Sequence, residues 1–443
     1  MSSLELISTL RWRGLIHQAT ASDDVLLRHL ATPRRVYVGF DPTADSLTIG
    51  NLVPAMMLVH AQRAGHRPVV VMGGGTGLIG DPSGKSSERT LMTRERVDAN
   101  VASQRRIFER LLSFDGPGAA TVVNNADWLG SISFLDALRD IGKYFSVNAM
   151  IQRDSVRDRL TNREQGISYT EFSYILLQSY DFQWLHEHMG VTVQMGGSDQ
   201  WGNIVGGIDL IRKTGPASER TGEAAQADVG ADAPAYGITA PLVTKADGGK
   251  FGKTETGAIW LTPERTSPYA YYQFWLNAAD ADVPKFLRTF TIMQRDEVEA
   301  LEATHAADPG KREAHRALAR HATALLHGEA EAAHAEAAGQ ALFSGDVAGL
   351  PERTLREVLA NVPSSTHAKT TLEGEGVPLL DLLLSTQLAS SKREAKDFLA
   401  AGSVTINGRK AGADDRVKTS DLLHGSMIAI RRGKKNWHLT TWT

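Results

Sequence analysis

The stretch VYVGFDPTADSLTIGNLVPAMMLVHAQ, residues 36–62, joins a short apolar run to a longer one through a polar turn. The first run, Val36–Phe40, predicts a buried strand, and the apolar residues after Leu52 recur at helical spacing. Between them, Asp41–Thr43 contains the proline that turns the chain. The stretch therefore predicts a strand, a turn and a helix.

The start of this expected helix suits an anionic ligand. A helix start exposes unpaired N–H groups and the positive end of the helix dipole, which favours a phosphate. Gly50 allows a ligand to come close to the backbone, and Thr48 and Asn51 flank it. We therefore expect Thr48 and Asn51 to bind a phosphate.

Residues 34–210 alternate short apolar runs with helical patterns, which is typical of a mostly parallel sheet covered by helices. Further strands are expected at HRPVVVMGG, TVVNN and VTVQMGG, with a helix near Ser133–Phe145. The fold class is therefore α/β, with a Rossmann-like sheet. Ligands of such sheets bind at the carboxyl ends of the strands.

The chain divides by composition into parts with different expected roles. Residues 1–262 are expected to form the α/β domain, and residues 215–234, rich in Ala, Gly and acid, are expected to be a mobile surface insertion in it. Residues 263–362 have helical patterns, 363–376 are expected to be a linker, and 377–443 form a separate small α+β unit.

The last part is basic although the whole chain is not. Residues 377–443 contain eleven Lys or Arg and six Asp or Glu, a net charge of +5. Since the chain totals −3, the other 376 residues carry −8. Basic charge concentrated at one end is typical of an RNA-binding appendage.

The composition excludes several classes of protein. No cysteine occurs, so disulfides, thiolate metal sites and a thiol nucleophile are excluded. No apolar run reaches about 18 residues and the charged start does not resemble a signal peptide, so we expect a cytoplasmic protein with no membrane span. The histidines are scattered without metal-ligand spacing, so no protein-bound metal or organic cofactor is expected.

Two glycine-rich stretches could bind phosphates. In VMGGGTGLIGDPSGKSSER the P-loop pattern fails, because Ile79 stands where it needs glycine, and a merely flexible loop is the alternative. Lys250 and Lys253 in KFGKT could close over a polyphosphate, although a lysine-rich surface turn is the commoner explanation.

One helix face could recognise an amino acid. Tyr174, Gln178 and Asp181 follow one another at spacings of four and three residues, so they share a face. The alternative is a solvated polar face, but the apolar residues around them indicate burial, and buried polar groups need partners.

Taken together, six motifs resemble bacterial tyrosyl-tRNA synthetase, a class I aminoacyl-tRNA synthetase. In chain order they are YVGFDPTADSLTIGNL, GGGTGLIGDPSGK, NNADW, YILLQSYD, QMGGSDQWGN and KFGKT. The basic end, SKREAKDFLAAGSVTINGRK, resembles the alpha-L RNA-binding module that such synthetases carry at this end.

The resemblance implies the reaction and its partners, with residues 1–262 as the catalytic domain and residues 263–362 as the helical anticodon-side domain. Tyrosine and ATP, which enters with Mg²⁺, would give tyrosyl-adenylate and pyrophosphate, and the tyrosyl group would pass to tRNA(Tyr), in a homodimer whose interface includes SVNAMIQRDSVRDRL. Tyr37 and Asp181 match the pair that binds the substrate phenol. A site built to bind a hydroxyl rejects the analogue lacking it by about 10⁴–10⁵, a range for which tyrosyl-tRNA synthetase is itself the reference case.

The resemblance also assigns the other site residues. For tyrosine they are Asp81, Tyr174, Gln178 and Gln200; for the nucleotide Gly39, Asp41, Gly50, Gly197 and Asp199; for the phosphates Thr43, Thr48, Asn51, Lys85, Arg89, Lys250, Lys253 and Thr254.

The chain departs from the family at Thr48, where the motif usually has histidine. One hydrogen-bond donor in such a site is worth about 2–4 kcal/mol, so a slower but active enzyme is expected. Two alternatives remain: a catalytically weakened paralogue acting as an RNA-binding protein, and a transferase that joins another carboxylate to AMP.

Overall fold

The computed structural model describes residues 5–81, 91–153, 156–157, 160, 167–215, 233–246, 248–249, 251–254, 257–360, 362–433 and 436–443, with backbone alone for 253 and 254. Contacts divide the chain into two compact units. The first contains residues 1–266 and 278–318, and the second contains 267–277 and 319–443. Among the described helices, none is both long and apolar enough to cross a membrane.

The first unit is built on a six-stranded sheet in the order β1-β6-β5-β2-β3-β4. Five strands pair in parallel, whereas the short β1 is antiparallel to β6. Since β2 pairs with β3 on one side and β5 on the other, the strand order changes direction there. The strands are β1 (Gln18–Ala19), β2 (Arg35–Phe40), β3 (Arg67–Met72), β4 (Thr121–Asn124), β5 (Val191–Gly197) and β6 (Tyr236–Ala240).

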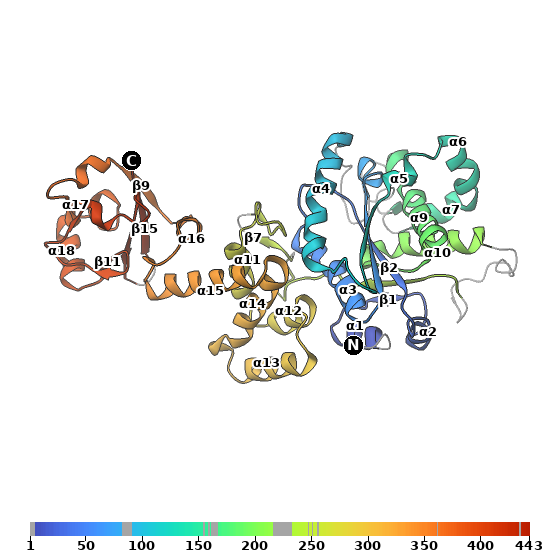
Figure 1. Ribbon diagram of the computed structural model, residues 1–443, viewed down its shortest axis with the longest axis horizontal. Helices are drawn as coiled ribbons and strands as arrows, with labels where there is room; N and C mark the ends of the chain where they lie inside the picture. The colour runs from blue at the N-terminus through green and yellow to red at the C-terminus, as the bar shows by residue number, and fades with distance from the viewer. Residues whose placement is uncertain are drawn as a thin grey trace. The chain divides into compact units, whose positions relative to one another are not determined.

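The central strands are apolar along their length because helices cover both faces of the sheet. Helix α3 (Leu52–Arg63) packs on β2, β3 and β5, and α4 (Arg94–Leu111) packs on β3. Helices α9 (Tyr169–Met189) and α10 (Trp201–Thr214) pack on β5 and pack closely on each other. Figure 1 shows the first pair on one side of the sheet and the second pair on the other.

Short elements complete the first unit. They are α1 (Leu6–Trp12), α2 (Asp23–His29), η2 (Ile49–Asn51), η3 (Thr76–Leu78), α5 (Ala126–Leu129), α6 (Phe134–Asp136), η4 (Ala137–Ile141), η5 (Gly142–Tyr144), α7 (Val147–Ile151), η6 (Ser198–Gln200), the hairpin of β7 (Lys253–Thr254) and β8 (Gly257–Ala258), α12 (Val283–Phe290), α13 (Arg295–Ala307) and η8 (Pro309–Lys311). Helix α14 (Glu313–His327) begins in this unit.

The helix expected near Ser133–Phe145 is present but irregular, because α6 passes directly into a π-helical turn and then a 3-10 turn. Phe134 and Leu135 are exposed in this chain, so no packed apolar face holds a regular helix there.

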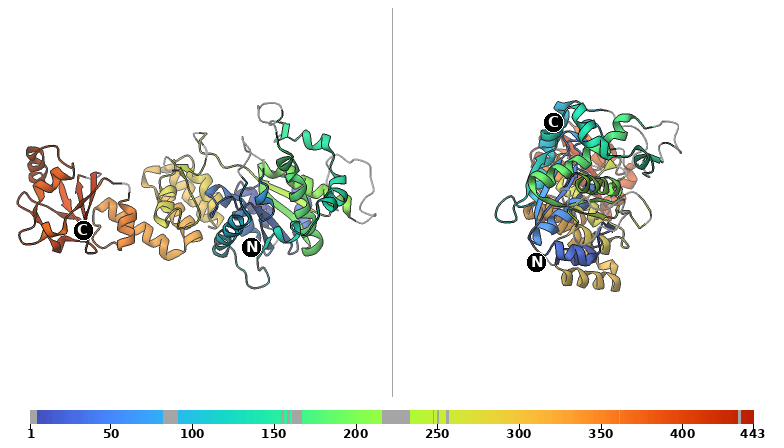
Figure 2. Two further views of the ribbon diagram at one scale, coloured as in Figure 1. Left: turned by 90° about the horizontal axis from the view of Figure 1, so that it is seen from above. Right: turned by 90° about the vertical axis from the view of Figure 1, so that its right-hand side faces the viewer.

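The second unit contains a five-stranded sheet in the order β12-β11-β14-β15-β9. Helices α17 (Leu379–Ser385) and α18 (Lys392–Ala400) cover one face through a core that includes Leu383, Leu399 and Ile430. Helices α15 (Glu329–Ser344) and α16 (Glu352–Val358) pack on the other through Ala338, Leu355 and Met427. These layers can be followed in Figure 1 and, from above, in Figure 2.

The elements of the second unit are α11 (Pro268–Leu276), α15 (Glu329–Ser344), α16 (Glu352–Val358), β9 (Ser364–His367), η9 (Lys369–Leu372), β10 (Val377–Pro378), α17 (Leu379–Ser385), α18 (Lys392–Ala400), β11 (Val404–Ile406), β12 (Arg409–Lys410), β13 (Arg416–Val417), η10 (Thr419–Asp421), β14 (Met427–Arg432) and β15 (Asn436–Trp442). Strands β10 and β13 form a separate antiparallel pair.

The linker expected at 363–376 needs correction. Strand β9 lies within it and pairs in parallel with β15, and Leu372 is buried in the core beneath α17. The polar composition of these residues predicted a linker, because the strand that pairs with β9 lies far away, at the end of the chain. The insertion expected at 215–234 lies almost wholly outside the described residues.

Candidate active site

A cavity of about 650 Å³ opens at the carboxyl ends of β2 and β5, where the strand order changes. Its walls come from these two strands, from α9, and from the segments that follow β2, β3 and β5. This is the place where open parallel sheets bind ligands, and the volume is that of a small-molecule site.

Tyr37 and Asp181 lie together in the cavity wall and are almost completely buried. Tyr37, on β2, is 1% exposed and Asp181, on α9, is 4% exposed. The hydroxyl of Tyr37 has no hydrogen-bond partner among the described residues. Its ring packs edge-on against Phe182, 5.2 Å between centroids, which holds the hydroxyl in place. A buried hydroxyl without a partner indicates a polar group on the ligand.

Asp181 is held by two donors from the turn after β4. Asn125 donates from Nδ2 to Oδ2 at 2.9 Å, and Trp128 donates from Nε1 to Oδ1 at 2.7 Å. Burial raises the pKa of Asp181 to about 7, against the two hydrogen bonds, which lower it. Burial, with the charge of Asp181, also raises the pKa of Tyr37 well above its ordinary value, so Tyr37 keeps its proton and can donate.

The hydrogen bonds continue from Asn125 to the turn after β2. Asn125 also donates to Oγ1 of Thr76 at 2.9 Å, and Thr76 donates to Oδ1 of Asp41 at 2.7 Å. Tyr174 donates to the other oxygen of Asp41 at 2.9 Å. We call Asp41, Thr76, Asn125, Trp128, Tyr174 and Asp181 the buried polar network. It ties three strand ends to α9.

The glycines after β3 make room for this network. A Cβ on Gly73 would overlap the carboxylate of Asp41, and a Cβ on Gly74 would overlap the amide of Asn124. The glycine run therefore has a packing role here, as well as the ligand-binding role expected for it.

Two amide oxygens in the wall have no donor within the described part of the chain. They belong to Gln178, on α9, and to Gln194, on β5, which is 2% exposed. Close by in the same wall, Gln200 donates to Asp81 at 2.8 Å and to Asp199 at 3.0 Å. Carboxylates and bare amide oxygens accept hydrogen bonds, so this part of the wall suits a cationic ligand group such as an ammonium.

At the start of α3, Thr48 and Asn51 form a reciprocal cap. Asn51 Oδ1 accepts from Thr48 Oγ1 at 2.9 Å and from Thr48 N at 3.1 Å. With its oxygen occupied on this side, the amide of Asn51 presents its two N–H donors elsewhere. We call residues 48–51 the helix start. Gly39 has open space where a Cβ would lie, which leaves room for a ligand beside it.

The helix start is tied to the segment that contains KFGKT. Ile49 N donates to Ile259 O at 2.9 Å, and Ile259 N donates to Gly252 O at 3.0 Å. Gly252 has a φ of +76°, and a Cβ there would overlap Cγ2 of Ile49. Phe251 stacks on Phe290 of α12 at 5.2 Å. The two motifs are therefore in direct contact.

The structure brings most of the expected site residues into one cavity. Those that line it are Tyr37, Gly39, Asp41, Thr43, Thr48, Gly50, Asn51, Asp81, Tyr174, Gln178, Asp181, Gly197, Asp199 and Gln200. Lys85, Arg89 and Lys250 lie outside the described residues, as do the side chains of Lys253 and Thr254. Their roles stay predictions.

Sequence reasoning missed Thr76, Asn125, Trp128 and Gln194. Three of them belong to the buried polar network, and Gln194 presents one of the bare amide oxygens. The sequence contained a signal for Asn125 and Trp128, because both belong to the motif NNADW. This motif follows a predicted strand, as do the other turns in which site residues were predicted.

Two family models cover most of the chain. Residues 30–344 match the class I tRNA synthetases (W and Y), and residues 355–440 match the tyrosine–tRNA ligase SYY-like C-terminal domain. The first match spans the whole cavity, and the second spans the basic unit.

Curated relatives agree over the full length. The chain is 49% identical to the tyrosine–tRNA ligase of Aeromonas hydrophila, over 100% of both chains. It is 47% identical to the same enzyme of Roseiflexus castenholzii, over 98% of both. These comparisons give no support to a non-catalytic paralogue.

Solved structures agree as well. A C-terminally truncated mitochondrial tyrosyl-tRNA synthetase of Aspergillus nidulans is 31% identical, with a TM-score of 0.67 over 77% of this chain and 94% of that one. A tryptophanyl-tRNA synthetase of Encephalitozoon cuniculi, at 14% identity and a TM-score of 0.52 over 81% and 93%, shares the fold alone. The chain therefore belongs to the tyrosine–tRNA ligase family of class I aminoacyl-tRNA synthetases.

Proposed function

We propose that this chain activates L-tyrosine with ATP and transfers it to tRNA(Tyr). The tyrosine carboxylate attacks the α-phosphorus of ATP, and the bond to the leaving pyrophosphate breaks. A hydroxyl of the terminal ribose of the tRNA then attacks the tyrosyl carbonyl, and AMP leaves. The observation that carries the proposal is the buried pair of Tyr37, which lacks a partner among the described residues, and Asp181.

In this proposal the substrate phenol completes the buried pair. Its O–H donates to Asp181, and its oxygen accepts from Tyr37. Phenylalanine would leave both groups buried without that partner, which costs about 1–3 kcal/mol for each group. The wall with Asp81, Gln178 and Gln194 would take the tyrosine ammonium, with Gln200 positioning Asp81.

ATP, with its Mg²⁺, would lie along the helix start. Asn51 would donate to a phosphate, Thr43 would supply a further hydroxyl, and Gly39 and Gly50 would let the nucleotide approach. Asp199 would accept from the ribose. Lys85, Arg89, Lys250, Lys253 and Thr254 are proposed to gather round the pyrophosphate, where cations stabilise the charge that develops. Catalysis then consists of positioning and charge stabilisation.

A homodimer accounts for an exposed apolar surface on the first unit. Phe134 and Leu135, on α6, are 68% and 76% exposed, and Val147, on α7, is 57% exposed. Apolar residues exposed together mark interaction sites. Sedimentation should give twice the chain mass, and Leu135→Lys should give the chain mass, whereas Phe343→Lys, at an exposed position of the second unit, should not change it.

The basic unit would bind the tRNA through α18. Lys392, Arg393 and Lys396 are exposed on this helix and form no ion pair within the described chain. In contrast, Arg431 and Arg432 stack on Trp437 and Phe398 and bind backbone carbonyls. The contacts of such a basic surface with tRNA are mostly to phosphate groups and depend on the shape of the RNA. A cytoplasmic location, where tRNA(Tyr) is charged, follows from this function.

Tyrosine-dependent ATP–pyrophosphate exchange tests the proposal. Exchange should require tyrosine and be negligible with phenylalanine or tryptophan. Replacing Lys392, Arg393 and Lys396 together by alanine should leave exchange intact and weaken tRNA charging with a smaller salt dependence. Folded protein that binds tyrosine without exchange would contradict the proposal.

A further inference from the structure

A second group of chemically active side chains lies outside the cavity, among α12, α13 and α14. Asp280 precedes α12, His305 is on α13 and His315 is on α14. One ligand atom of each lies within 4.8 Å of the others. All three belong to the first unit.

Each imidazole donates one N–H to an oxygen of the same residue. His305 Nε2 lies 2.8 Å from the carbonyl oxygen of Asp280. His315 Nε2 lies 3.1 Å from a carboxylate oxygen of Asp280 and 3.2 Å from the carbonyl of Ala278. Because a carbonyl oxygen only accepts, Nε2 carries the proton in both rings, and Nδ1 of each neutral ring is a bare lone pair.

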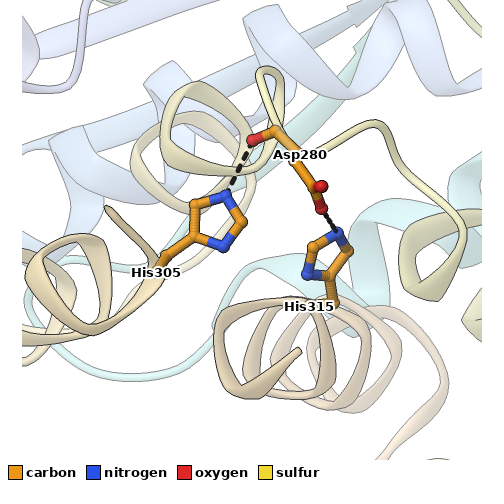
Figure 3. Close-up of side chains that lie close together, drawn as sticks. All are labelled: Asp280, His305 and His315. Atoms are coloured by element: carbon orange, nitrogen blue, oxygen red, sulfur yellow. Dashed lines mark hydrogen bonds and ion pairs between the residues drawn. The ribbon is translucent and has the colours of Figure 1, made fainter. Parts of the chain in front are cut away.

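Both lone pairs are buried without a donor. His305 is 8% exposed and His315 is fully buried, and Nδ1 of each has no hydrogen-bond partner within the described part of the chain. The ring centroids are 5.3 Å apart. In Figure 3 the two nitrogens that carry no dashed line lie on the sides of the rings turned away from Asp280. Two buried acceptors on neighbouring rings, neither with a donor among the described residues, leave a place for an electrophile that both could bind.

We propose that Nδ1 of His305 and Nδ1 of His315 bind a divalent transition-metal ion such as Zn²⁺. Neutral imidazole is the usual ligand of Zn²⁺. A ligating histidine almost always donates its other N–H to a carboxylate or a backbone carbonyl, and Asp280 supplies one of each. Asp280 is thus a positioning residue for both rings, and water completes the coordination.

The charges around the rings are consistent with this assignment. Burial lowers the pKa of His315, with Arg312 acting in the same direction, so the ring is neutral at neutral pH and its lone pair is available. The carboxylate of Asp280, which opposes Arg312, supplies a negative charge beside the ion. The bound ion would join α13 to α14 and fix the loop before α12.

Metal retention by the full-length chain tests the proposal. Chelator-treated protein is incubated with Zn²⁺ or Co²⁺ without nucleotide and freed of unbound metal. Zinc is then measured by elemental analysis and cobalt by its visible absorption, which reports nitrogen ligation. We expect one equivalent of metal, and a rise in melting temperature on adding zinc.

Glutamine variants isolate the two lone pairs. In His305→Gln and in His315→Gln the amide N–H can replace Nε2–H, but no lone-pair nitrogen replaces Nδ1, so both should lose the metal and the zinc-dependent rise. His334→Gln, at an exposed position of α15, should keep both. Asp280→Asn should weaken binding by about 10- to 100-fold.

Two results would overturn the proposal. One is wild-type protein that retains no metal and shows no cobalt spectrum, in which case a water or a proton lies between the rings. The other is metal retained equally by His305→Gln. His305→Gln keeps the test valid if a substitution at the fully buried position 315 prevents folding.

Discussion

The buried polar network and the helix start lie in the same cavity but are built differently. In the network, side chains from three strand ends and α9 hold one another, and Asp181 receives two donors before any ligand enters. At the helix start, the side chains of Thr48 and Asn51 hydrogen-bond to each other, and Ile49 is held through backbone hydrogen bonds. The first arrangement fixes one geometry, whereas the second is held by backbone and can tolerate a changed side chain.

This difference between the two arrangements matches the chemistry of the ligand groups proposed for them, the phenol of tyrosine and the polyphosphate of ATP. A neutral phenol can be selected only by buried groups placed to accept and donate, because leaving them unpaired is costly. A polyphosphate is recognised by charge and by helix-start N–H groups, which many side chains can supplement. Thr48, where the chain departs from the family pattern, belongs to the helix start, which is the part of the cavity that tolerates a changed side chain.

The largest effect is expected for Asp181→Ala, which disrupts the buried polar network. It removes the acceptor for the substrate phenol and leaves Asn125 and Trp128 as buried donors without their acceptor. We expect the tyrosine kcat/KM for pyrophosphate exchange to fall by about 10³-fold or more, and the preference for tyrosine over phenylalanine to fall with it.

The matched control for that variant is Gln183→Ala on the same helix. Gln183 bonds to Glu187 and Thr214, away from the cavity, so exchange should be unchanged. If Asp181→Ala kept its preference for tyrosine, discrimination would have to come from another part of the cavity.

The next effect concerns the contact between the helix start and the KFGKT segment. Gly252→Ala places a methyl group against Ile49 at a φ of +76°, so the segment must shift. We expect kcat for exchange to fall by about 10²-fold with tyrosine affinity unchanged, because a small misplacement of a catalytic segment costs about that much.

Gly248→Ala separates backbone strain from the contact. Gly248 has a φ of +79°, but nothing lies within 4 Å of the added methyl group. A much smaller loss is expected there. Equal losses in the two variants would show that strain alone, and not the contact with Ile49, matters.

The sequence predicted the sheet and the cavity well because both depend on local patterns. The apolar runs gave β2, β3, β4 and β5, and the spacing of Tyr174, Gln178 and Asp181 placed all three in the cavity wall. The position of the cavity at the carboxyl ends of the strands follows from the general rule for parallel sheets, whereas the strand order itself was not predicted.

What the sequence did not predict depends on contacts between distant residues. Strand β9 forms because β15, more than 70 residues later in the chain, pairs with it. Asn125 donates a hydrogen bond to Asp181, 56 residues later in the chain. His305 and His315 lie close to each other and to the loop residue Asp280, although their spacing in the sequence matches no metal-binding motif. Such long-range contacts cannot be predicted from composition or from the spacing of residues.

A smaller effect is expected when the helix start is given the usual residue of the family. Thr48→His adds a ring N–H within reach of the phosphates but removes the Thr48 hydroxyl from Asn51. We expect exchange to rise by about tenfold at limiting ATP, less than the full worth of one donor. Thr48→Val, which loses the hydroxyl and gains no donor, should be slower than wild type.

A result in which both Thr48 variants matched wild type would place the helix start outside the rate-determining contacts. A fall in the histidine variant would show that the orientation of Asn51 is worth more than the added donor. Tyrosine binding should be the same in all three proteins, since the Thr48 side chain hydrogen-bonds to Asn51 and not to the described residues of the buried polar network.

The smallest effect concerns the pH dependence of the buried polar network. The pKa of Asp181 is raised to about 7, so lowering the pH through this value protonates the carboxylate. Neutral carboxyl groups accept hydrogen bonds more weakly than carboxylates. We expect the Kd for tyrosine, measured without ATP, to rise by about three- to tenfold between about pH 8 and pH 5.5.

Asn125→Ala tests whether Asp181 is the group that titrates. The hydrogen bond from Asn125 lowers the pKa of Asp181, so its loss should raise that pKa and move the midpoint of the binding curve to higher pH. A midpoint that stayed in place would assign the pH dependence to a different group. Because Thr48→His adds a titratable ring on the other side of the cavity, it should leave this midpoint unchanged, and that independence is the closest test of whether the two sides work separately.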